Sequence, residues 1–301
     1  MNDTPAKLTL GPVLFNWQAE VWRDFYFRMA DEADVDVVYV GEAVCSKRAP
    51  FYAPYISDVI ERLQGAGKEV VLSTLALIMN TREMNDLRAM AEDTDGIMLE
   101  ANDVAACALL KDKPHVIGPF VNVYNEGTLN YFAERGAKRL CLPVELGRDA
   151  IRAMTVTNAA EIEACVFGRL PLAISARCYH ARHHGLHKDS CQFICEKDPD
   201  GLELDTIDSE SFLAVNGVQT MSYSYQNLSA ELAEMKDMGV THFRLSPHTC
   251  DMVQVAKVYH EMLNGTLDAE AADEILEDQL GGVAFSNGYY HGAPGVNFVA
   301  D

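Results

Sequence analysis

Eight short apolar segments alternate with amphipathic stretches along most of this chain, and this alternation limits the fold more than any other feature. The predicted strands are residues 8–15, 36–41, 69–77, 96–100, 115–123, 138–144, 163–175 and 241–247. Their apolar runs are nearly continuous, which is typical of strands buried on both faces of a parallel sheet.

The stretches between the strands carry apolar residues at about every third and fourth position, as amphipathic helices do. Predicted helices include residues 20–33, 56–67, 103–111, 127–136 and 148–156. Glycines such as Gly136 and Gly239 stand between a helix and the next strand, where helices commonly end. Eight such units predict an α/β fold, a (β/α)8 TIM-type barrel that need not be regular.

A doubly wound open sheet is the alternative fold. No strand is followed by a G-x-G-x-x-G or Walker loop, so the nucleotide-binding forms of that sheet lose their support. With 301 residues the chain can build one large core, and we expect a single barrel domain over residues 1–301.

Residues 176–228 are too long for an ordinary loop of such a barrel. The sequence Pro199-Asp200-Gly201 indicates a turn and Asn216-Gly217 a hairpin, so this insertion is predicted to be a β-rich lobe. Residues 281–301 are predicted to form a C-terminal tail, for which the sequence indicates no role.

The charge of the chain argues against one class of partner. There are 24 basic and 45 acidic residues, a formal net charge of −21, which disfavours nucleic acid because no basic stretch is strongly segregated. No basic segment with a following apolar run opens the chain, and no run of about eighteen apolar residues occurs. We therefore expect a cytoplasmic protein without a transmembrane segment.

Three cysteines, Cys178, Cys191 and Cys195, lie close together in the polar, His-rich insertion, and Cys45 lies far upstream. Thiolates bind zinc or iron–sulfur clusters, and four complete either site. Zinc fits less well because Cys45 has no near cysteine neighbour, and four free thiols of a reduced compartment are the third interpretation.

The barrel topology favours a joint site for these cysteines. Cys45 follows the second predicted strand and Cys178 the seventh, so both belong to the face that carries active sites in this fold. The remaining cysteines are predicted to be buried structural thiols, namely Cys107, Cys141, Cys165 and Cys250.

Acidic and amide side chains at strand ends are the candidate substrate ligands of the barrel mouth. They are Glu42, Glu100, Asn122, Asn125 and Glu145. Each could equally be a helix cap or a member of an ion pair. The sequence assigns no catalytic residue.

Five segments carry a resemblance that covers nearly the whole chain: GEAVCSKR (41–48), CLPVELGRD (141–149), LPLAISARC (170–178), LAVNGVQTMS (213–222) and RLSP (244–247). The chain resembles the collagenase-like peptidase superfamily, in particular its iron–sulfur branch in oxygen-independent ubiquinone biosynthesis. The resemblance implies that Cys45, Cys178, Cys191 and Cys195 bind a 4Fe-4S cluster. It further implies a heterodimer with a UbiU-like protein and anaerobic ring hydroxylation of a ubiquinone precursor.

By analogy with superfamily members that hydroxylate RNA bases, prephenate is the expected oxygen donor. A noncatalytic subunit whose cluster transfers electrons is the alternative, and a peptidase is less favoured because H-E-x-x-H and G-x-S-x-G are absent. The insertion is richer in histidine than the resemblance leads us to expect. Loop histidines are usually solvated, and we expect this of His180, His183, His184 and His187.

Overall fold

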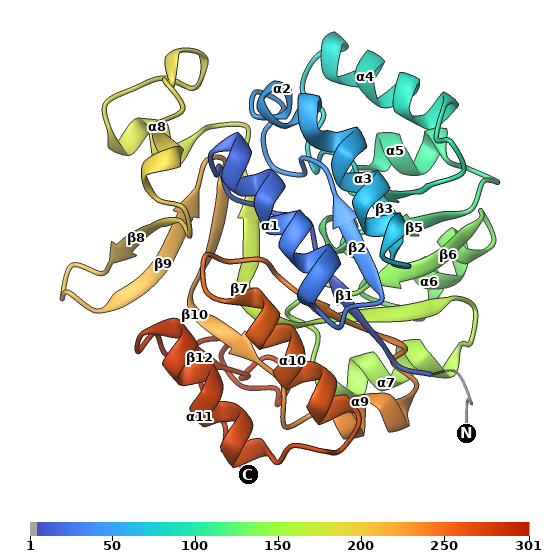
Figure 1. Cartoon of the computed structure of the whole chain (residues 1–301), viewed down its shortest axis with the longest axis vertical. Helices are drawn as coiled ribbons and strands as arrows, with labels where there is room; N and C mark the ends of the chain where they lie inside the picture. The colour runs from blue at the N-terminus through green and yellow to red at the C-terminus, as the bar shows by residue number, and fades with distance from the viewer. Residues whose placement is uncertain (1–4, 301) are drawn as a thin grey trace.

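The computed structural model describes residues 5–300, so the ends of the predicted domain, residues 1–4 and 301, lie outside it. Eight parallel strands form a closed ring (Figure 1). They are β1 (Lys7–Leu10), β2 (Val37–Val40), β3 (Glu69–Ser73), β4 (Met98–Ala101), β5 (His115–Ile117), β6 (Ala137–Cys141), β7 (Glu161–Ile174) and β11 (His242–Leu245). Each neighbouring pair is parallel, and β11 pairs with both β1 and β7. This closure confirms the predicted TIM-type barrel.

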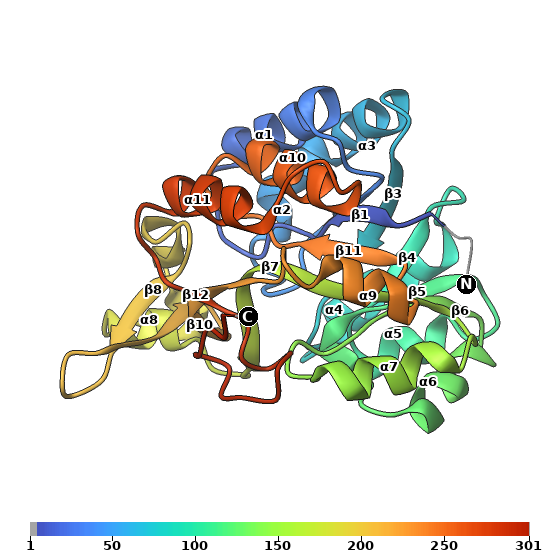
Figure 2. The ribbon, with the colours of Figure 1, turned by 90° about the horizontal axis from the view of Figure 1, so that it is seen from below.

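Helices surround the ring, as the alternating pattern predicts. They are α1 (Ala19–Glu32), α2 (Ala49–Tyr52), α3 (Ile56–Gly65), α4 (Thr81–Glu92), α5 (Val104–Leu109), α6 (Glu126–Ala133), α7 (Arg148–Val156), α9 (Leu232–Met238), α10 (Met252–Leu263) and α11 (Ala269–Leu280). Figure 2 shows α1, α3 and α10 on one side of the strands and α6 and α7 on the other. Apolar side chains of helices and strands pack into one large core.

One predicted glycine position illustrates how tightly a helix feeds the next strand. Gly136, between α6 and β6, has a φ of +102°, and a Cβ atom there would lie 2.5 Å from the Lys113 carbonyl oxygen. Only glycine avoids both the left-handed strain and this close contact.

The insertion builds a lobe beside the ring, as predicted. The outer half of β7 pairs antiparallel with β10 (Gln219–Asn227), which pairs with β9 (Ser211–Asn216), which in turn pairs with β8 (Leu202–Asp205). The tight β9–β10 turn is the predicted Asn216-Gly217 hairpin, with Gly217 at φ +64°. The lobe also carries α8 (Tyr179–His183) and projects from one side of the barrel (Figure 1).

The C-terminal segment packs back against the molecule. The short strand β12 (Phe285–Ser286) pairs with β10, and Tyr290 is buried. Over residues 5–300, no helix combines the length and apolar character needed to cross a membrane.

Charged side chains fill the centre of the barrel. Arg244 on β11 donates to Glu100 on β4 and to Glu163 on β7, each at 2.7 Å, and its guanidinium lies 3.9 Å from the centre of the Tyr39 ring. Both carboxylates are fully buried. Burial alone would raise the pKa of Glu163, but Arg244 lowers it to about 2. A buried cation thus links strands on opposite parts of the ring.

We predict that Arg244→Leu destabilises the fold by about 3–5 kcal/mol at pH 7, because it leaves two buried carboxylates without their cation. The exposed Arg152, which pairs with Glu234, serves as the control, and Arg152→Leu should cost less than about 1 kcal/mol. Urea unfolding of both variants measures the difference. A loss for Arg244→Leu no greater than that of the control would contradict the role of this cation.

The same variant predicts a pH effect. The depressed pKa of Glu163 contributes stability to the wild-type protein that is present above its ordinary value of about 4.3 and lost as the pH falls toward about 2. In Arg244→Leu the unpaired, buried Glu163 protonates more readily. The difference in the free energy of unfolding between wild type and the variant should therefore shrink as the pH falls through this range. A difference that stays constant with pH would count against this assignment.

Candidate functional site

Three segments carry the four predicted ligand cysteines to the carboxyl end of the barrel. Cys45 lies in the loop after β2, and Cys178 caps the N-terminus of α8, just beyond β7. Cys191 and Cys195 follow in two short 3-10 turns of the lobe. Cys195 is buried and the other three are half-buried. The Cys178 Sγ accepts a hydrogen bond from the Ala181 backbone N–H at 3.4 Å.

The buried side chain of Arg48 lies among these cysteines. Burial alone would lower its pKa, but the charges of Glu42, Cys195 and Cys45 hold the pKa above its ordinary value. Arg48 Nη1 donates to the Leu14 carbonyl at 2.8 Å, whereas the buried Nε has no hydrogen-bond partner among residues 5–300. The site therefore holds a fixed positive charge with one unused donor.

The guanidinium also ties the Cys45 loop to the lobe. Its Nη2 donates to Asn216 Oδ1, at the end of β9, at 2.8 Å. Lys47 Nζ donates to the Lys188 carbonyl at 2.5 Å, and the rings of Phe51 and Phe193 meet edge to face with centroids 4.7 Å apart. Residues distant in sequence are thus fixed side by side.

The backbone between Cys191 and Cys195 is unusual. Gln192 and Phe193 both have a φ of +52° without being glycine, a conformation that L-residues rarely adopt. Such strain persists only where surrounding contacts enforce it, and it commonly marks a ligand site. Here it turns the chain so that both cysteines belong to the same compact loop.

The pKa shifts of the thiols also reflect their proximity to one another. Burial raises the pKa of Cys178, and the nearby Cys195 and Cys191 raise it further. Burial likewise raises the pKa of Cys45, against the opposing effect of Arg48. Cys45 and Cys178 therefore need a positive group nearby before both can become thiolates.

The spacing of the thiols bears on which group fits. A tetrahedral zinc ion with Zn–S bonds of about 2.3 Å holds its sulfur atoms about 3.8 Å apart. Within residues 5–300, the ligand trio with all atoms inside 4.8 Å of one another is His180, His184 and Asp198, and no three cysteines form such a group. The four thiol donors, with a buried cation that offsets negative charge, fit the ligand set of a 4Fe-4S cluster.

The histidines of the lobe differ in their environments. His180 is fully buried, with Nε2 2.8 Å from Asp198 Oδ2 and Nδ1 3.2 Å from the Val215 carbonyl. The expectation of a solvated side chain is therefore wrong for His180, because it anchors α8 to β9. His183, His184 and His187 are exposed, as expected.

Three of the five candidate substrate ligands lie outside the cavity described below and have structural partners. Glu42 accepts hydrogen bonds from the backbone of Val44 and Cys45 at 2.7 and 2.9 Å and so shapes the Cys45 loop. Asn125 caps α6 through the Thr128 N–H. Glu100 points into the barrel, where Arg244, Ser73 and Asn102 occupy its oxygens. A substrate-binding role for these three stays a prediction.

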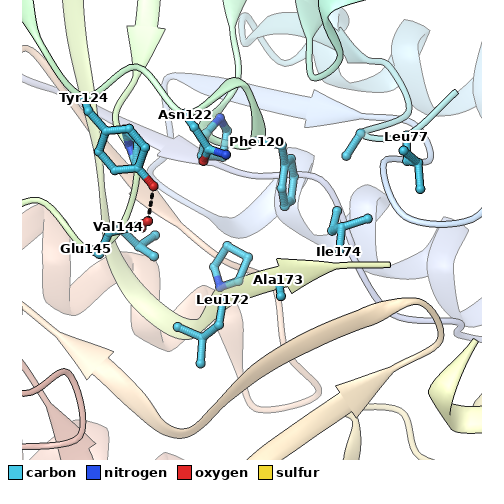
Figure 3. A pocket seen from close by; sticks show the side chains of 13 residues that line it. Leu77, Phe120, Asn122, Tyr124, Val144, Glu145, Leu172, Ala173 and Ile174 are labelled. Carbon is cyan, nitrogen blue, oxygen red and sulfur yellow. Dashed lines mark hydrogen bonds between the residues drawn. The ribbon is translucent and has the colours of Figure 1, made fainter. Parts of the chain in front are cut away.

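The other two candidates, Asn122 and Glu145, line a cavity of about 280 Å³ at the carboxyl ends of β3, β5, β6 and β7. Its wall consists of Ala76, Leu77, Pro119, Phe120, Asn122, Tyr124, Pro143, Val144, Glu145, Pro171, Leu172, Ala173 and Ile174. In Figure 3 the hydrogen bond from Tyr124 to Glu145 marks one end, and Leu77, Phe120 and Ile174 lie toward the other. The structure thus unites two predicted ligands in one concave site.

Comparison with known proteins identifies the family of the chain. The model of "Peptidase family U32" matches residues 25–299, nearly the whole chain. The chain belongs to peptidase family U32.

Several solved structures resemble this U32 chain. A U32 peptidase is 14% identical over 82% of this chain and 94% of its own, with a TM-score of 0.46. N-acetylneuraminate lyase from Fusobacterium nucleatum is 10% identical over 91% of this chain and 79% of its own, at 0.47. A chain of the tryptophan synthase complex from Pyrococcus furiosus is 10% identical over 92% and 98%, at 0.44. Structures as distant as these do not indicate a function for this chain. The assignment of the barrel fold rests on the pairing of its strands.

Two side chains of the site in this U32 chain were not predicted from the sequence. Arg48 stands three residues after Cys45, but a single arginine in a polar loop gives no sign that it will be buried. Tyr124 lies between two predicted ligands, Asn122 and Asn125, and was overlooked although an aromatic residue beside strand-end amides could have suggested a pocket wall.

Proposed function

We propose that this U32 chain is a UbiV-type iron–sulfur subunit, required for the oxygen-independent ring hydroxylation of ubiquinone precursors. The observation that carries this proposal is the assembly of Cys45 with the three cysteines of the lobe around the buried Arg48. A peptidase has no need of such a group of thiols. The sequence resemblance supplies the substrate and the pathway.

In this proposal Cys45, Cys178, Cys191 and Cys195 hold a 4Fe-4S cluster. When bound, the cluster supplies one-electron transfer, at a potential that nearby charges and hydrogen bonds to sulfur tune. Arg48 offsets the negative charge of the thiolates, and the Ala181 N–H donates to the Cys178 sulfur. A UbiU-like partner completes the enzyme, and prephenate is the proposed oxygen donor.

A noncatalytic subunit whose cluster only transfers electrons is the second candidate. The half-buried state of Cys45, Cys178 and Cys191 favours it, because a cluster close to the surface can exchange electrons with a partner. Both candidates share the cluster, and they differ in whether this chain binds the reacting ring.

The geometry gives little support to a peptidase. Between residues 5 and 300, no hydrogen bond joins a histidine nitrogen to a cysteine sulfur. His248 Nε2 already accepts the Arg169 backbone N–H at 3.0 Å, and both ring nitrogens of His180 are engaged. Neither of these two imidazoles is free to activate a thiol nucleophile.

We predict that the protein purified without oxygen is brown and contains about four irons per chain. Alanine at Cys45, Cys178, Cys191 or Cys195 should each remove most of the iron and sulfide, because a methyl group cannot replace a thiolate ligand. Cys107→Ala is the matched control and should retain both, since Cys107 packs against the core in α5. The measurement is the iron and sulfide content of each variant. Stoichiometric zinc without sulfide would contradict the assignment of a cluster.

We further predict a one-to-one heterodimer on co-expression with a UbiU-like protein. Size-exclusion chromatography coupled to light scattering should show one species with the summed mass, stable at moderate salt. If the two chains elute separately under anaerobic conditions, with iron present in each, the proposed partnership is wrong.

Deletion of the gene in its host should lower ubiquinone only in cells grown without oxygen, with precursors that lack ring hydroxyls accumulating. The wild-type gene and Cys107→Ala should restore ubiquinone, and Cys178→Ala should not. Quinone analysis by mass spectrometry under both atmospheres provides the measurement. Unchanged anaerobic ubiquinone in the deletion strain, with no second copy of the gene, would refute the function.

A further inference from the structure

The cavity at the carboxyl ends of β3, β5, β6 and β7 has a polar end and an apolar end. At the polar end Tyr124 donates to Glu145, and the Asn122 side chain makes no hydrogen bond within the described part of the chain. Burial raises the pKa of Tyr124 to about 12, and Glu145 adds to this effect, so the hydroxyl stays protonated. Its proton is committed to the carboxylate.

The charge of the lining limits what can bind. Among residues 5–300, no lysine, arginine or histidine lines this cavity, whereas the exposed Glu145 contributes a carboxylate. An anionic group beside Glu145 would be repelled, although water screens part of this repulsion, and an anionic group at the apolar end would lose its hydration without a polar partner. A neutral ligand with a hydroxyl group could instead donate to Glu145 and accept from the Asn122 amide.

The remaining wall selects for hydrocarbon. Leu77, Phe120, Val144 and Ile174 face the same space, and Leu172 at its rim is 40% exposed. An apolar cavity of about 150 Å³ holds one benzene molecule, so about 280 Å³ suits a single ring with a short branch. A longer chain would have to leave over the rim at Leu172.

The cavity also borders the cysteine site. Ile174 in its wall lies four residues before Cys178 on the same continuous segment. Lys188, three residues before Cys191, reaches the carbonyl of Ala176 and the sulfur of Met79, each at 3.2 Å, and Met79 follows the wall residue Leu77. The lobe that carries the cysteines thus packs on two segments that form the cavity.

We propose that this cavity binds the neutral phenolic ring of the substrate, with the ring hydroxyl between Glu145 and Asn122 and the first part of the hydrocarbon substituent against Leu77, Phe120 and Ile174. The inference rests on the proposed function for the identity of the phenol. It assigns ring binding to this chain rather than to its partner, and it favours a decarboxylated phenol over a hydroxybenzoate.

Two probes that differ by one carboxylate group test the proposal on the purified full-length chain. We expect 2-allylphenol to bind, and 3-allyl-4-hydroxybenzoate to bind at least about tenfold more weakly, because its carboxylate is para to the hydroxyl and would be placed against Leu77, Phe120 and Ile174 without a polar partner. Glu145→Gln should weaken phenol binding several-fold. Isothermal titration and ligand-observed NMR, performed without oxygen, measure both.

A blocking variant and a matched control complete the test. Ile174→Trp should fill the apolar end of the cavity, where the Ile174 side chain points toward Phe120 and Leu77 (Figure 3), and abolish phenol binding while iron content and urea unfolding stay as in wild type. Val156→Phe, at an exposed position of α7 outside the cavity, should change neither phenol binding nor stability. Equal phenol binding by wild type and Ile174→Trp, or no preference for the neutral probe, would overturn the assignment. Phenol binding is measured without turnover. The binding proposal can therefore fail while the deletion phenotype supports the proposed function, and the deletion phenotype can fail while the cavity still binds the phenol.

Discussion

The parallel pairing of β7 with β11 is the constraint on which the rest of the structure depends. By closing the ring it places the carboxyl ends of all eight strands on one face, whatever their separation in sequence. This places Cys45 after β2 and Cys178 after β7 on the same face, and the contacts of Arg48, Lys47 and Phe51 with the lobe bring their segments together. The same closure encloses Arg244 between Glu100 and Glu163, and the paired charges keep the centre of the barrel from being a site for an anionic ligand.

The barrel could be predicted because its signal is repeated eight times. Each of the predicted strands occurs in the ring, and the hairpin at Asn216-Gly217 follows from local turn chemistry. Side-chain direction was harder to predict. Glu100 ends a strand, as a mouth residue should, yet it points inward because Arg244, 144 residues later, provides its partner. No local pattern reveals a pair so distant in sequence.

The cysteine site shows the same limit. Cysteine spacing indicates candidate ligands, and topology brings them to one face, but the charge that makes the site suit an anionic cluster comes from Arg48. Its burial depends on Leu14 and Asn216, which belong to a different strand end and to the lobe. The prediction that His180 is solvated was wrong for a similar reason. Its partners Asp198 and Val215 come close to it only in the folded lobe.

The insertion joins the two halves of the candidate site. β7 runs past the ring, so that its outer residues Leu172 and Ile174 form a cavity wall and its continuation reaches Cys178. A ligand in the cavity and a cofactor held by the thiols would then press on the same segment from two sides. Among residues 5–300, no cationic side chain lines the cavity, whereas Arg48 lies buried among the thiols, so the two environments differ in charge. In the proposed function, the extension of β7 beyond the barrel would therefore place the substrate ring beside the cluster while keeping their electrostatic requirements apart.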